Sequence, residues 1–156
     1  MLGDSCRETV QAAMDLAVKH EKLISFDPNI HRKLWKGRDF VPMLRDMMFR
    51  AQIVLLGADE AEALLGVSEA RRVMDILFEK GQARYVAVKN GAKGAIVGDG
   101  DGLTEIPPFP CASIDPVGAG DAFNAAFLCG ILEGKDVADC GRMGAVAGAL
   151  ATETYG

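Results

Sequence analysis

The sequence predicts a layered α/β fold, because short apolar runs with strand character alternate with longer stretches of helical periodicity. The chain has 156 residues, of which 49% are hydrophobic and 25% charged, so it is long enough for one domain with a buried core. No internal repeat or low-complexity segment interrupts the alternation.

In the first half of the chain, the apolar runs at residues 23–27 and 53–56 predict buried strands. Ser68 is expected to cap a helix, and Gly66 and Gly81 are expected to stop helices. The first helix can be capped by Asp4 or Ser5, and its core-facing stripe is expected at Val10, Met14, Ala17 and Val18. Helices are expected at residues 4–20, 39–50, 59–65 and 68–80.

The second half of the chain predicts a small antiparallel unit followed by two helices. A turn at Asn90-Gly91 should join two strands into a hairpin, and a second turn at residues 99–102 should lead to a third strand. The proline-rich residues 107–110 are expected to form an irregular connector. The strands are expected at residues 85–89, 95–97 and 104–106, and the helices at residues 119–132 and 137–152.

Charge and cysteine content exclude several classes of protein. The net charge of −5 and the pI near 5.0 give no basic surface for nucleic acid. No apolar run is long enough to span a membrane. The cysteines have no metal-like spacing, so we expect reduced thiols in a cytoplasmic protein. They are Cys6, Cys111, Cys129 and Cys140.

A glycine turn at Gly118-Ala119-Gly120 opens directly into the helix expected at residues 119–132. Glycines let a ligand approach the backbone, and the first turn of a helix presents N–H groups at the positive end of its dipole. This pattern predicts an anion site suited to phosphate, with Asp121 placed as a general base. The alternative is a glycine loop followed by an ordinary helix cap.

The run Asp-Pro-Val-Gly-Ala-Gly-Asp-Ala-Phe at residues 115–123 resembles the C-terminal signature of the ribokinase-like (PfkB) carbohydrate kinases. It is most similar to the 2-keto-3-deoxygluconate kinase branch, with Pro116 where the family usually has Thr. The resemblance implies a three-layer α/β/α sandwich. It also implies that Asp121 is the catalytic base and that Gly118, Ala119 and Gly120 form the anion hole for the transferred phosphoryl group.

Two segments in the first half also resemble motifs of this family. The segment at residues 27–35 is similar to the Asp-Pro-Asn-x-Arg stretch near the substrate, which implies substrate contacts by Asn29, His31 and Arg32. His31 stands where the family has Arg, and the alternative is a plain turn after a strand. Glu60 matches the family's glutamate near magnesium, although Gly57 replaces an Asn. Glu60 could equally be a first-turn acid placed against the helix dipole.

The residues that follow the strand at 85–89 resemble the family's nucleotide loop, with Asn90 in place of Leu. Structurally, this loop is also a simple hairpin turn. Residues 144–150 resemble the small-residue helix that lines the adenine site, but a helix rich in Gly and Ala usually indicates close packing, so we expect packing only. The resemblance implies ATP binding by Lys89, Asn90, Gly91, Ala92, Lys93 and Gly94.

These resemblances imply an ATP- and Mg2+-dependent kinase for a sugar or sugar acid, most like 2-keto-3-deoxygluconate. A fructokinase and a non-catalytic nucleotide-binding or assembly module are the alternatives. We expect residues 1–156 to form a single partial domain, the C-terminal nucleotide-binding part, without the sugar-binding half and lid. Little sugar kinase activity is therefore expected from this chain alone, and homo-oligomerisation or self-association is expected.

Overall fold

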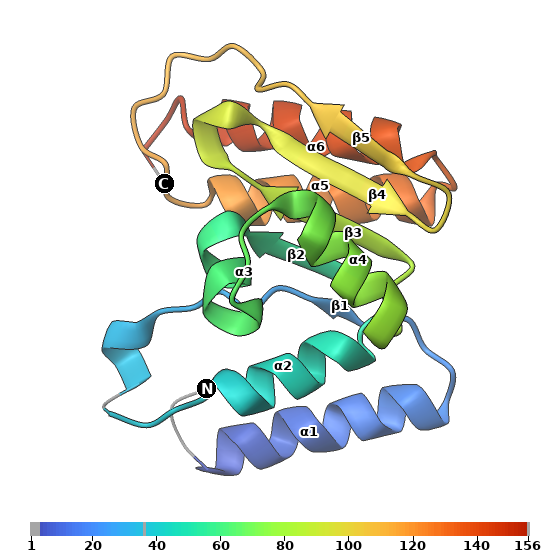
Figure 1. The fold of residues 1–156 in the computed structure, drawn as a ribbon. Helices are drawn as coiled ribbons and strands as arrows, with labels where there is room; N and C mark the ends of the chain where they lie inside the picture. The colour runs from blue at the N-terminus through green and yellow to red at the C-terminus, as the bar shows by residue number, and fades with distance from the viewer. Residues whose placement is uncertain (1–3, 36, 156) are drawn as a thin grey trace. The chain divides into compact units, whose positions relative to one another are not determined.

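The computed structural model describes residues 4–35 and 37–155, and it has the mixed α/β composition that the sequence predicts (Figure 1). The described residues group into two compact units, Met1–Arg84 and Tyr85–Gly156. The expectation of one partial domain over residues 1–156 stays a prediction.

In the N-terminal unit, strands β1 and β2 pair in parallel, with Ser25 opposite Ile53 and Phe26 opposite Val54. Strand β2 is buried for most of its length, as expected for its continuous apolar run. The elements of this unit are α1 (Asp4–Lys19), β1 (Ser25–Phe26), the 3-10 helix η1 (Arg32–Trp35), α2 (Val41–Arg50), β2 (Ile53–Gly57), α3 (Ala58–Leu65) and α4 (Ala70–Lys80).

The core of this unit is formed by β2 and by one face each of α2, α3 and α4. In α2, Leu44, Met47 and Met48 are buried at helical spacing. An ion pair between Arg50 and Asp15 joins α2 to α1. The predicted stripe of α1 is only partly correct. Met14 is buried, Val10 and Ala17 are half-buried, and Val18 is 46% exposed, so the buried face of α1 is narrower than predicted. Of the two predicted caps of α1, Ser5 lies within the helix, and the side chain of Asp4 lies outside the described residues.

The strand predicted at residues 23–27 is wrong in extent, because only Ser25 and Phe26 are paired and Leu23 is 52% exposed. Pro28 has no N–H to continue a ladder. The N–H of Asn29 donates instead to Oδ1 of Asp27 at 3.0 Å, which turns the chain immediately after the strand.

Two helices begin later than predicted because a side chain fixes each start. Oδ1 of Asp39 accepts the N–H of Val41 at 3.0 Å, so the helix predicted from residue 39 begins at Val41. The predicted cap at Ser68 is wrong, because the carboxylate of Glu69 accepts the N–H groups of Arg71 and Arg72, at 3.1 and 3.2 Å. This satisfies donors that the first turn leaves unpaired, and α4 begins at Ala70.

In the C-terminal unit, β3, β4 and β5 form an antiparallel meander, in which Lys89 lies opposite Ala95 and Ala95 opposite Ile106. Helix α6 packs on β4 and β5, and α5 packs against α6 (Figure 1). The predicted hairpin is confirmed, and its turn is a short 3-10 helix. The elements are β3 (Tyr85–Lys89), η2 (Gly91–Lys93), β4 (Ala95–Asp99), β5 (Leu103–Ile106), α5 (Ala119–Leu132) and α6 (Val137–Ala151).

Helices α5 and α6 approach closely because glycines lie at their contacts. A Cβ on Gly130 would be 2.8 Å from Sγ of Cys140, and a Cβ on Gly144 would be 2.9 Å from the ring of Phe123. A Cβ on Gly148 would be 3.0 Å from the carbonyl oxygen of Ala119. The first two distances are shorter than real Cβ contacts and the third is tighter than most, so a side chain at any of these positions would require the neighbouring atoms to move.

The described cysteines form no disulfide: Cys6, Cys111 and Cys129 are exposed and Cys140 is buried. Burial raises the pKa of the Cys140 thiol above its ordinary value, and the nearby carboxylates of Asp136 and Asp139 act in the same direction. Within residues 4–35 and 37–155, no helix combines the length and apolar character that crossing a bilayer requires.

We predict that Gly94→Ala destabilises the protein by about 2–4 kcal/mol. Gly94 has a φ of +88°, and a Cβ there would lie 2.1 Å from the carbonyl oxygen of Ile106. Urea unfolding should therefore show a lower midpoint. Gly100→Ala is the matched control at the other end of β4, because a Cβ at Gly100 meets nothing within 4 Å. Equal midpoints for the two variants would contradict the prediction.

Candidate active site

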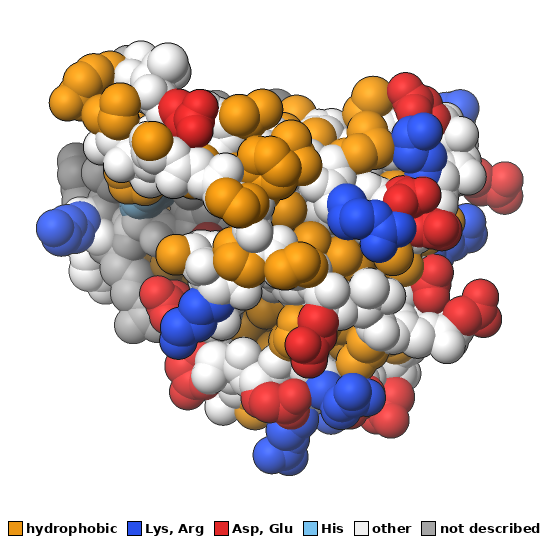
Figure 2. Space-filling model, turned by 90° about the horizontal axis from the view of Figure 1, so that it is seen from above, with side chains coloured by type: hydrophobic (Ala, Val, Ile, Leu, Met, Phe, Trp, Pro, Cys, Tyr) orange, Lys and Arg blue, Asp and Glu red, His pale blue; other side chains and the backbone are white. Residues whose placement is uncertain are grey.

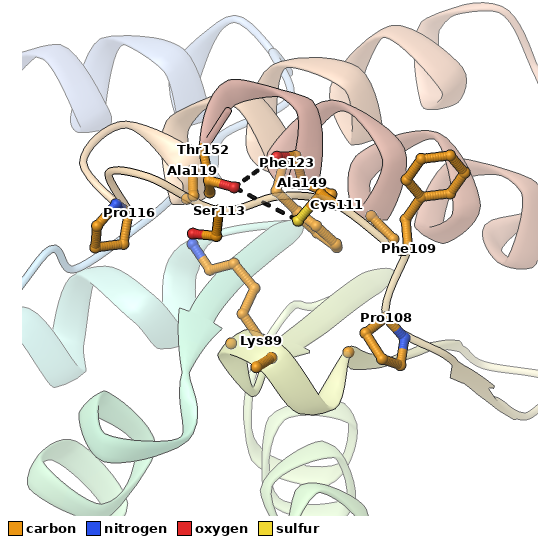
Figure 3. Close-up of a pocket in the computed structure, with 16 residues that line it drawn as sticks. Lys89, Pro108, Phe109, Cys111, Ser113, Pro116, Ala119, Phe123, Ala149 and Thr152 are labelled. Atoms are coloured by element: carbon orange, nitrogen blue, oxygen red, sulfur yellow. Dashed lines mark hydrogen bonds between the residues drawn. The ribbon is translucent and has the colours of Figure 1, made fainter. Parts of the chain in front are cut away.

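A cavity of about 340 Å³ lies in the C-terminal unit, bordered by the β3–β4 turn, the connector after β5, and helices α5 and α6 (Figure 3). Its volume is in the range of small-molecule sites. Residues that the sequence assigned to nucleotide or phosphate binding form part of its wall. They are Lys89, Gly91, Ala92, Gly94, Ala119 and Gly120.

The glycine turn forms the start of α5. Gly118 has a φ of +80°, a left-handed conformation that favours glycine, and its carbonyl accepts the N–H of Ala122 at 2.9 Å. Oδ1 of Asp115 accepts the N–H of Val117 at 2.9 Å and shapes the approach to the turn. No side chain caps α5, and the N–H of Ala119 donates to the carbonyl of Pro116 at 3.3 Å. The positive end of the helix dipole therefore meets no capping side chain, which suits an anionic ligand.

The end of α6 holds this turn in place through Thr152, which is only 8% exposed. Its carbonyl oxygen accepts the N–H groups of Ile114 at 2.7 Å and Asp115 at 3.0 Å. Its hydroxyl donates to the carbonyl of Ala149 at 2.7 Å and lies 3.5 Å from Sγ of Cys111 (Figure 3). The connector before α5 is therefore fixed to α6 at several points.

Lys89 is the last residue of β3, and its side chain reaches α5. Its Nζ donates to Oδ1 of Asn124 at 3.0 Å, and a Cβ on Gly120 would lie 3.7 Å from this nitrogen. A positive charge therefore lies beside the first turn of α5. Asp121 is exposed in the same turn, next to Gly120 in the chain, but it is not part of the cavity wall.

The other residues that line the cavity are mostly apolar and were not assigned to a site from the sequence. Phe109 and Pro108 come from the connector, which was expected only to be irregular, and they lie on the other side of Figure 3 from Pro116. Ala145 and Ala149 come from the helix that was assigned to packing alone. The resemblance of that helix to an adenine-lining helix could have predicted that it borders the cavity. The connector has no hydrophobic periodicity from which its cavity-lining residues could be predicted.

In the N-terminal unit, Asn29 and His31 border a hollow of about 490 Å³, and both side chains are exposed. Asn29 has a φ of +41°, which points to a tight turn. His31 also borders a second hollow, of about 760 Å³, together with Glu60. Arg32 begins the 3-10 helix η1, but its side chain lies outside the described residues.

Both carboxylate oxygens of Glu60 accept backbone N–H groups. Oε1 accepts from Ile30 at 2.7 Å, and Oε2 accepts from Gly57 at 2.8 Å. Glu60 thus satisfies the start of α3 and also holds the segment that carries His31. Among the described residues, no group of three or more His, Cys, Asp or Glu side chains could hold a metal ion. A magnesium ion would need phosphate oxygens and water for most of its coordination.

A family model described as pfkB family carbohydrate kinase matches residues 1–156. An "uncharacterized sugar kinase" of Archaeoglobus fulgidus is 35% identical over 133 residues, which cover 85% of this chain and 51% of that protein. The 2-dehydro-3-deoxygluconokinase of Bacillus subtilis is 34% identical over 138 residues, which cover 86% of this chain and 42% of that protein.

A solved structure of a Xylella fastidiosa fructokinase with bound ATP matches the fold with a TM-score of 0.87 and 25% identity. The match covers 100% of this chain and 53% of the fructokinase. These findings confirm the predicted kinase family and its α/β fold. The chain spans about half the length of the curated relatives it matches.

We predict that Glu60→Gln speeds hydrogen exchange at the amides of Ile30 and Gly57 by about tenfold or more. An amide side chain replaces one acceptor with a donor, and a hydrogen bond to a charged group contributes about 1.5–3 kcal/mol. Exchange can be followed by NMR. Glu62→Gln is the control, because Glu62 is exposed in the same helix. Unchanged exchange in Glu60→Gln would show that these hydrogen bonds do not order the segment.

Proposed function

The chain belongs to the pfkB family of carbohydrate kinases, and on this premise we propose that it serves ATP-dependent phosphorylation of a sugar or sugar-acid hydroxyl. The cavity of the C-terminal unit carries the proposal. One part of its wall combines Lys89 with the uncapped first turn of α5, which suits phosphate. Another part combines Phe109 with small apolar residues of α6, which suits a nucleotide base.

In this reaction the hydroxyl oxygen of the sugar attacks the γ-phosphorus of ATP. The new O–P bond forms as the bond from the γ-phosphorus to the bridging oxygen breaks, and ADP leaves with that oxygen. Asp121 accepts the proton of the hydroxyl. The N–H groups of Gly118, Ala119 and Gly120 stabilise the charge on the transferred phosphoryl group, supported by the dipole of α5.

The β3–β4 turn is proposed to hold the remaining phosphates and the ribose of ATP. Gly91, Ala92 and Gly94 support this assignment because they border the cavity, and Asn90 and Lys93 are their neighbours in the chain. Magnesium, when bound, would neutralise phosphate charge. We assign it to phosphate oxygens and water, with Glu60 acting through water because both of its oxygens accept N–H groups.

The proposed substrate is 2-keto-3-deoxygluconate, and Asn29, His31 and Arg32 are proposed to contact it. The 34% identity to the Bacillus subtilis 2-dehydro-3-deoxygluconokinase supports this choice. A fructokinase is the second candidate, and it is supported by the TM-score of 0.87 with the Xylella fastidiosa fructokinase. Phosphorylation assays with both substrates, in a full-length protein that contains this chain, would decide between them.

We also propose that the chain self-associates. Large hydrophobic side chains are exposed in the C-terminal unit, including Ile114, Val117, Leu150 and Tyr155. Figure 2 shows hydrophobic side chains at the surface, among charged ones. Such surfaces favour association. Sedimentation equilibrium should show an average mass above 16.6 kDa that rises with concentration, whereas a constant monomer mass would contradict the proposal.

Asp121→Asn should lower kcat by about 10²–10⁴-fold, the usual contribution of a positioned general base. Sugar-dependent ADP release, measured in a full-length protein that contains this chain, tests this expectation. Asp101→Asn is the control, because Asp101 is exposed in the β4–β5 turn. The base assignment fails if Asp121→Asn keeps normal turnover. Loss of ATP binding in this variant would instead indicate disruption of the turn.

A further inference from the structure

We propose that the Lys89 side chain is a further catalytic residue, whose ammonium binds the γ-phosphoryl group, and that Asn124 positions it. The inference rests on the proposed function and deepens it, because the sequence assigned Lys89 to nucleotide binding only as part of a backbone loop. In the structure, the Lys89 side chain reaches α5, where its Nζ contacts Asn124 and lies beside Gly120.

The geometry places the ammonium at the anion-binding turn. Lys89 ends β3, and its Nζ lies 3.0 Å from Oδ1 of Asn124. A Cβ on Gly120 would be 3.7 Å from the same nitrogen, so the ammonium lies against the face of Gly120 that lacks a side chain. Lys89, Ala119 and Gly120 all border the same cavity. In Figure 3 the Lys89 side chain points from β3 toward the segment that carries Ser113.

The electrostatic argument follows from this placement. The N-terminus of a helix carries about half a positive charge, whereas a lysine adds a full one. The chain has a net charge of −5, so a triphosphate must be held by local positive groups. Lys89 is half-buried, so its interaction with a phosphate is screened less than that of a fully exposed lysine.

Asn124 suits the positioning role because of its location and its neutrality. It follows Gly120 by four residues in α5, and residues at this spacing share one face of a helix. Its amide oxygen accepts from the ammonium without cancelling its charge, as a carboxylate would. An ammonium has three donors, so it can hold Asn124 and a phosphate oxygen at the same time. Lys89 keeps its proton throughout, and the hydroxyl proton goes to Asp121.

The test compares the affinities of ATP, ADP and adenosine by calorimetry in magnesium buffer. Lys89→Met should weaken ATP binding by about 10- to 100-fold, weaken ADP binding less, and leave adenosine binding unchanged. Lys89→Arg should restore most of the ATP affinity because it keeps the charge. Asn124→Leu should weaken ATP binding in the same direction by a smaller factor. Lys135→Met is the control, because Lys135 is exposed and does not border the cavity.

The outcomes separate this inference from the proposed function. Wild-type protein that binds neither ATP nor adenosine overturns both. Wild-type protein that binds ATP, together with an unchanged Lys89→Met variant, overturns only the role of Lys89. A parallel loss of ATP and adenosine in Lys89→Met also overturns that role, because it indicates a damaged pocket. Urea unfolding of each variant shows whether it is folded. Selective loss of ATP affinity supports the inference.

Discussion

The contact between α5 and α6 is the constraint on which the rest of the C-terminal unit depends. Glycines at this contact bring the two backbones together, and α6 in turn packs on β4 and β5. Small residues of α6 therefore border the cavity directly. The far end of α6 holds the connector through Thr152, which fixes the approach to the glycine turn. The packing of this unit and the wall of the cavity thus depend on the same two helices.

Backbone groups and side chains have different roles in the proposed site. In the proposed function, backbone N–H groups and the helix dipole bind the anion at the start of α5, so the sequence there needs glycine more than any particular functional group. Glu60 shows the converse in the N-terminal unit, where one carboxylate orders two backbone segments. A charged residue in a family motif can therefore act through the main chain. Lys89 is proposed to act through its side chain instead, because its ammonium adds a full charge beside α5, where the backbone supplies only dipoles.

Local sequence signals predicted much of the fold and part of the site. The bounds of β3 and α5 were correct, since Gly118 and the apolar run of β3 mark them clearly. The start of α4 was wrong because Ser is a preferred cap by residue type, whereas in the fold the longer carboxylate of Glu69 reaches the first-turn N–H groups. The contact of Lys89 with Asn124 spans 35 residues and has no local signal. Phe109 was missed because an irregular connector reveals its inward residues only after it is folded.

A substitution at Gly148 would affect two features together: the packing of α6 on α5, and the glycine turn proposed to bind phosphate. Its position borders the cavity, and the nearest atom to a Cβ there would be the carbonyl oxygen of Ala119, at 3.0 Å. Backbone atoms yield less readily than the end of a flexible side chain. A larger residue at 148 would therefore displace the first turn of α5. A change at this position would therefore alter the turn as well as the packing, so in the proposed function a single interior substitution affects ligand binding and stability together.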